Sequence, residues 1–94
     1  AEDRELAARA VELDLARLAT ETVHDFVPRA LDKRIDLGYE GPGAYDDPTP
    51  TERSRVRGHP LLLGELLRNL IDNALHYTPS GGTVTVRVVA DPFG

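Results

Sequence analysis

One long apolar segment that carries two asparagines, residues 63–77, constrains the fold of this chain most. Asn69 and Asn73 are four positions apart, so in a helix their amides stack on adjacent turns, toward the edge of the apolar side. Asparagine is a mediocre helix former, and two in one helix call for a reason. From the residues alone two interpretations stay open: the amides hold a ligand at a half-buried seam, or they only face water. The apolar side itself would consist of Leu63, Leu66, Leu67, Leu70, Ala74 and Tyr77.

The end of this helix and the strand after it are also marked in the sequence. Residues 78–82, Thr-Pro-Ser-Gly-Gly, stop the helix, because proline cannot continue the turn and glycine accepts a positive φ. From Thr83 to Val89 valines alternate with polar residues, which predicts a strand.

The pattern L-L-x-N-L-I-D-N-A-L-x-Y-T-P-x-G-G-x-V-x-V resembles the N box of histidine kinase ATPase domains. That superfamily also includes DNA gyrase, MutL and heat-shock chaperones, and its members bind Mg-ATP between this helix and a mixed sheet. The resemblance is specific from about Gly58 to Val88. It implies an α+β fold: a partial, truncated Bergerat-type sandwich with helices over a mixed sheet and an N-terminal helical stub.

Carried over residue by residue, the resemblance implies a nucleotide and metal site with ATP and Mg²⁺ as cofactors. Asn73 matches the asparagine that ligates Mg²⁺, and Asn69 matches the one a turn earlier, beside the metal and phosphates. Their amide oxygens are hard, neutral ligands that suit a Mg²⁺ already held by triphosphate. Tyr77 matches the family tyrosine near the nucleotide. His76 replaces the Lys or Arg of many members, and a largely neutral histidine weakens a phosphate role. No catalytic residue is assigned.

Composition limits the size and the partners of the domain. The 94 residues, 40% of them hydrophobic, suit one small soluble domain. There is no cysteine for disulfides, and a net charge of −5 disfavours nucleic acid as a partner. We find no basic, apolar leader and no apolar run of ~18 residues or more, so this stretch is expected neither to cross a membrane nor to direct export.

The N-terminal third reads as two helical pieces. Residues 1–13 are charged and alanine-rich, with helical spacing of Leu6, Ala10 and Leu13, and are interpreted as the end of the dimerisation helix and a linker. Residues 14–94 are assigned to the N-terminal portion of the ATP-binding domain, without its glycine boxes and ATP lid. Asp14 is expected to cap a helix to about Lys33, with a kink or break near Pro28. Its expected buried stripe is Leu15, Leu18, Ala19, Thr22, Phe26, Ala30 and Leu31.

Two short strands are expected between the helices. Residues 35–40 alternate apolar and polar and should form a strand that ends at Gly41. A turn-rich loop over residues 41–50 is expected to be disordered. Residues 53–57 should form a second strand, after which Pro60 opens the central helix with His59 as a weak cap.

Two further motifs have a functional and a plain interpretation. The glycines at 41 and 43 resemble the box that contacts adenine, but that box should follow the central helix, so a surface turn is favoured. His24 beside Asp25 could be a phosphoacceptor pair. The family places that histidine in an earlier helix, so a surface histidine is favoured.

The resemblance implies an ATP-binding catalytic domain fragment of a bacterial sensor histidine kinase. Such a kinase autophosphorylates on a histidine of its own dimerisation domain and passes the phosphoryl group to the receiver domain of a response regulator. A homodimer is expected, with this domain on the cytoplasmic side of an inner-membrane protein, and the fragment alone should be inactive. The alternative is a non-catalytic ATPase-fold interaction module, anti-sigma-like or a degenerate kinase.

Overall fold

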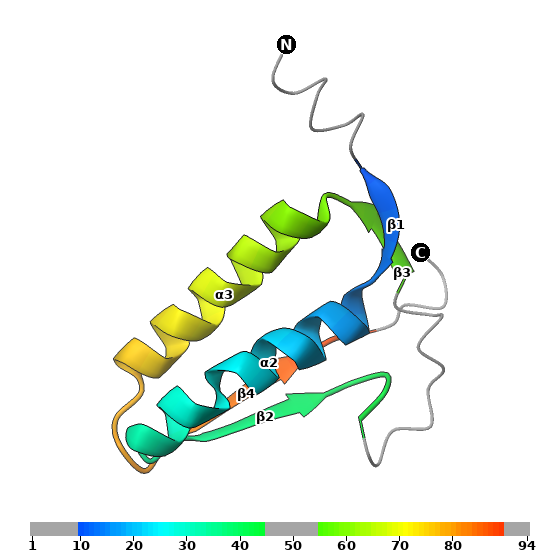
Figure 1. Cartoon of the computed structure of the whole chain (residues 1–94). Coiled ribbons are helices and arrows are strands. Elements are labelled where there is room, and N and C mark those ends of the chain that lie inside the picture. Colours follow the sequence, from blue (N-terminus) through cyan, green and yellow to red (C-terminus); the bar gives the residue numbers. More distant parts are fainter. Residues whose placement is uncertain (1–9, 45–54, 90–94) are drawn as a thin grey trace.

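The computed structural model describes residues 10–44 and 55–89 as two helices and four strands (Figure 1). β2 and β4 pair in parallel, and β1 pairs with β3 antiparallel, so the described residues contain two separate two-stranded sheets. The helices pack on each other, and they contact the β2–β4 sheet, α2 through β2 and α3 through β4. This arrangement confirms the predicted α+β class. In chain order the elements are β1 (Val11–Asp14), α2 (Leu15–Asp32), β2 (Asp36–Glu40), β3 (Arg55–Gly58), α3 (Pro60–Tyr77) and β4 (Thr83–Arg87).

Strand β1 corrects the expectation that the helical stub reaches residue 13. Val11 lies opposite Gly58 and Leu13 opposite Val56, so ladder hydrogen bonds replace helical ones over these residues. Asp14 explains why the helix cannot run through: its backbone is extended, and its carboxylate accepts a hydrogen bond from the backbone N–H of Arg17 at 3.2 Å. A cap of this kind fixes the start of α2 at residue 15. The remainder of the expected stub, residues 1–9, lies outside the described residues.

Helix α2 follows its prediction closely, with two exceptions. It is continuous through Pro28, so a break at that position was a wrong expectation. Leu31 is 69% exposed, and Leu15 and Leu18 are only half-buried, so the predicted buried stripe is wrong at these three positions. The residues that are buried lie at helical spacing toward α3 and the sheet: Ala16, Ala19, Thr22, Val23, Phe26 and Ala30.

Helix α3 begins and ends where the sequence predicts, but it presents a different face to the core. His59 accepts a hydrogen bond from the backbone N–H of Leu62 at 3.4 Å, a long bond that suits a weak cap. The buried residues are Ile71 and Leu75. Leu66 and Leu70 are more than half exposed, so the predicted apolar stripe is wrong at these positions. The cause is α2, because Ile71 and Leu75 face the buried cluster that α2 contributes.

The strands and turns place a small core between the helices and the β2–β4 sheet. Residues 41–44 form a turn closed by the backbone N–H of Ala44 and the carbonyl of Gly41, whereas the rest of the predicted loop lies outside the described residues. Gly81 has a φ of 91°, as the stop signal after α3 requires. The buried core consists of Val23, Phe26, Ala30, Ile35, Ile71 and Leu75, with Leu37, Tyr39, Val84 and Val86 packed against it.

Over residues 10–44 and 55–89, neither helix is both long and apolar enough to cross a bilayer.

Candidate functional site: the outer face of helix α3

The two asparagines lie on the outer face of α3. Asn69 and Asn73 are both exposed, and they are one turn apart. With ~100° of rotation per residue, both positions point well away from Ile71 and Leu75, the residues that the helix buries. The structure therefore brings the two amides together on one face. This face is open to solvent, so the half-buried seam expected from the helical wheel is not found within the described residues.

His76 and Tyr77 extend this face to the end of the helix. Their rings meet edge to face, with centroids 4.9 Å apart and planes at 83°. Both side chains are exposed, Tyr77 by 79%, so its predicted place on the apolar side of the helix is wrong. The four predicted site residues thus lie in the C-terminal half of one helix, with the His76–Tyr77 pair at its end.

The donors on this face fit a metal ion whose other ligands come from phosphate. Asn69 and Asn73 offer neutral amide oxygens, which are suitable ligands for Mg²⁺. In the part of the chain that the structure describes, no three His, Asp or Glu side chains gather into a metal site. The two described side chains that would hold the cation are neutral amides and bring no negative charge to it. A nucleoside triphosphate would have to supply the negative charge that balances the cation.

An apolar groove runs beside this face, and the sequence patterns did not predict it. It has a volume of about 260 Å³ and lies between α3 and β4. The signal in the sequence was the leucine periodicity of the helix together with the alternating valines of the strand. Only their packing shows that a groove separates them. Its lining residues are Leu67, Leu70, Ile71, Ala74, Val84, Thr85, Val86 and Arg87.

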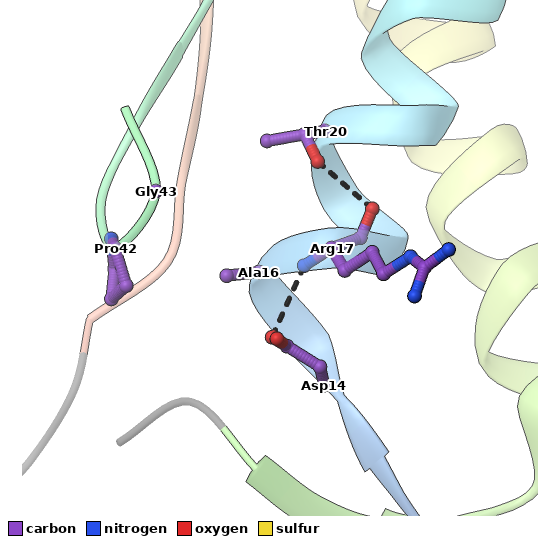
Figure 2. A pocket seen from close by; sticks show the side chains of 6 residues that line it. All are labelled: Asp14, Ala16, Arg17, Thr20, Pro42 and Gly43. Atoms are coloured by element: carbon purple, nitrogen blue, oxygen red, sulfur yellow. Dashed lines mark hydrogen bonds between the residues drawn. The ribbon is translucent and has the colours of Figure 1, made fainter. Parts of the chain in front are cut away.

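The glycine turn at residues 41–43 lies at a different place, beside the start of α2. Pro42 and Gly43 lie across a hollow from Asp14, Arg17 and Thr20 (Figure 2), and this hollow has a volume of about 400 Å³. The Asp14 carboxylate already occupies the N–H of Arg17 there, and the Thr20 hydroxyl donates to the Arg17 carbonyl at 2.9 Å. The negative charge of the capping Asp14 carboxylate would repel a phosphate at this helix start. The turn is thus not part of the α3 face.

The His24–Asp25 pair also has a structural explanation. His24 is exposed, and Asp25 forms an ion pair with Arg68 of α3 at 3.1 Å. Asp25 therefore joins the two helices. This contact supports the interpretation of His24 as a surface histidine.

Comparison with known proteins shows that the chain is similar to sensor histidine kinases. No family model matches the chain. It is 36% identical to the sensor protein kinase PmrB of Pseudomonas aeruginosa over 76 residues, which is 81% of this chain and 14% of PmrB. The cytoplasmic segment of histidine kinase QseC superposes with a TM-score of 0.70 at 34% identity, covering 87% of this chain and 49% of that one. Histidine kinase ThkA, in its complex with response regulator protein TrrA, superposes with a TM-score of 0.65 at 23% identity, over 83% of this chain and 21% of that one.

The two helices on a parallel strand pair give the chain the fold of part of the cytoplasmic segment of histidine kinase QseC. The chain belongs to the sensor histidine kinase family. It spans 20% or less of the length of the curated relatives it matches first. These relatives are kinases, which favours the kinase interpretation over the non-catalytic alternative.

Proposed function

We propose that this chain is the N-box part of an ATP-binding domain that phosphorylates a histidine on its own dimerisation domain. The observation that carries the proposal is the exposed pair Asn69 and Asn73 on α3, in a chain that aligns with a sensor kinase over 81% of its length. In this proposal the domain binds Mg-ATP over the outer face of α3.

Each residue of the face has a distinct task. The side-chain oxygens of Asn73 and Asn69 would hold Mg²⁺ beside the phosphates, and Tyr77 would border the nucleotide. His76 would offer a hydrogen bond to phosphate rather than a fixed positive charge. Phosphoryl transfer depends on positioning and on neutralising charge more than on covalent help from the protein, and a bound Mg²⁺ supplies that neutralisation. Two amides on a rigid helix suit that demand.

The proposed partners follow from the relatives. ThkA has been solved with a response regulator, and we extend to this chain the transfer of a phosphoryl group to the aspartate of such a regulator. Residues 1–13 would connect the domain to the dimerisation helix of a homodimer. The matched part of QseC is a cytoplasmic segment, and we place this domain on the cytoplasmic side of a bacterial inner-membrane protein.

The test uses the protein encoded by the longest reading frame that contains this chain. Asn73→Ala should abolish phosphate incorporation from labelled Mg-ATP and weaken nucleotide binding in calorimetry, while the circular dichroism spectrum and Tm stay as in the parent. The matched control is Glu21→Gln, another exposed position, on α2, whose contact is with Arg17 of the same helix. Near-normal phosphate incorporation by Asn73→Ala would refute the proposal.

A further inference from the structure

Three side chains at four-residue spacing, two on α2 and one at its C-cap, make polar contacts with residues of α3 that are 42 or 43 positions later. Asp25 of α2 pairs with Arg68 of α3 at 3.1 Å, and Arg29 pairs with Asp72. One turn further on, Lys33 Nζ donates to the main-chain carbonyl of His76 at 2.8 Å and to that of Leu75. Both helices therefore run in the same direction, and the contacts recur every four residues on each (Figure 1).

The ring of Phe26 holds the two arginines of this row. The Arg29 Cζ lies 6.0 Å from the ring centroid, and the Arg68 Cζ lies 5.4 Å from it. Cations over an aromatic face are attracted to it, so each guanidinium is fixed both by the ring and by its carboxylate. Phe26 itself is buried in the core. The row is therefore anchored to the buried core.

The middle contact is the one in which loss of a partner matters most. The Asp72 Oδ1 that faces Arg29 is shielded from solvent. The Asp72 side chain as a whole is 44% exposed, so after removal of Arg29 it would turn further toward water. Asp72 is directly followed by Asn73, and Asn69 is three positions earlier. Any rotation of α3 that accompanies the loss of this pair would carry both amides with it.

We propose, on the basis of the function proposed above, that Arg29 is a positioning residue for Mg-ATP: by holding Asp72 it fixes the rotation of α3 at which Asn69 and Asn73 face the nucleotide together. Arg29 touches neither the nucleotide nor the metal in this account. Its effect passes through the helix. The exposed ion pairs of the row add little to stability, so the Arg29–Asp72 pair biases the orientation of α3 modestly and does not hold the fold together.

The test is a binding experiment with a double-mutant cycle, in the protein from the longest reading frame that contains this chain. Arg29→Gln should weaken calorimetric Mg-ATP affinity about 2- to 5-fold, because an exposed ion pair can bias the orientation of α3 by no more than that, and should lower Tm by less than about 4 °C. Arg29→Lys should recover part of the affinity. The matched control is Arg17→Gln, which removes an ion pair within α2, and it should bind as the parent does.

The cycle separates positioning from general damage. Asp72→Asn should weaken binding as Arg29→Gln does, and the double variant should be no weaker than either single one, since both act through one contact. Additive losses, or normal affinity in Arg29→Gln, would overturn the proposal. If Arg29→Gln does not fold, the Asp72→Asn and Arg29→Lys variants decide by the same criterion: parent-like affinity in both overturns it.

Asn73→Ala tells this proposal from the function on which it rests. If Asn73→Ala binds Mg-ATP as tightly as the parent, the proposed function fails and the positioning role fails with it. If Asn73→Ala loses binding while Arg29→Gln keeps it, only the positioning role of Arg29 is overturned.

Discussion

Lys33 and His76 fix the end of α3 through its backbone, since the Lys33 ammonium donates to the His76 carbonyl at 2.8 Å while the imidazole stays exposed. The side chain at position 76 contacts the Tyr77 ring edge to face. Its replacement should therefore leave the helix end in place. This separation makes position 76 a direct probe of charge on the asparagine face.

His76→Lys should tighten Mg-ATP binding or leave it unchanged, because an ammonium is fully charged at neutral pH and an imidazole largely is not. Calorimetric titration of the protein from the longest reading frame measures the affinity, with His76→Gln as the uncharged reference. A clear loss of affinity in the lysine variant would show that the imidazole has a specific role on phosphate.

Leu75→Ala should lower the free energy of unfolding by about 2–5 kcal/mol, since this side chain is fully buried and its removal leaves a cavity. Leu31→Ala is the matched control on α2, and at 69% exposure it should cost no more than about 0.5 kcal/mol. Urea denaturation followed by circular dichroism measures both. Similar losses in the two variants would contradict the observed orientation of the helices.

Gly41→Ala should destabilise the fold by about 1 kcal/mol or more. Gly41 has a φ of 140°, and an added Cβ would lie 2.5 Å from the carbonyl oxygen of Val88. At Gly38 an added Cβ meets nothing within 4 Å, so Gly38→Ala in strand β2 is the control and should be nearly neutral. Thermal unfolding compares the two. Equal Tm values for both variants would show that Gly41 tolerates a side chain.

The isolated 94-residue chain should self-associate, because α3 exposes a row of leucines at four-residue spacing. Leu62, Leu66 and Leu70 are 44%, 54% and 57% exposed. Light scattering after size-exclusion chromatography should show a mass above 10.3 kDa, and Leu66→Lys should lower it toward that value. The control Glu65→Gln changes the neighbouring position without removing apolar surface. A monodisperse monomer would contradict this prediction.

Much of the fold could be predicted from local signals. The alternation in residues 35–40, the stop after Tyr77 and the cap at Asp14 each depend on neighbours a few positions away, and the structure confirms them. Strand β1 was not predicted because its partner, β3, begins 41 positions after the end of β1, and no residue near Val11 indicates the pairing. The helical spacing of residues 6, 10 and 13 led to the prediction of a helix at this position instead of a strand. Long-range pairing is the part of a fold that local patterns do not carry.

The buried face of α3 was also predicted wrongly, and again the cause is a contact with residues far away in the sequence. The helix is apolar on most of its circumference, so leucine periodicity allows several buried faces. Contacts with Phe26 and the α2 charges select the face with Ile71 and Leu75. The choice of Asn69, Asn73, His76 and Tyr77 came from a motif, and the structure places all four on the exposed side of one helix. Their roles toward ATP and Mg²⁺ stay predictions.

The parallel pairing of β2 with β4 has a consequence for the order of folding. Glu40 lies opposite Arg87, 47 positions later, and the crossover between them includes the whole of α3. Helices form locally and quickly, whereas this pairing must first close a long loop, at an entropic cost that grows with ~(3/2)RT ln n. The sheet should therefore close in the rate-limiting step. Since α3 docks against α2 and β4 together, the asparagines take up their common orientation only when that step is complete.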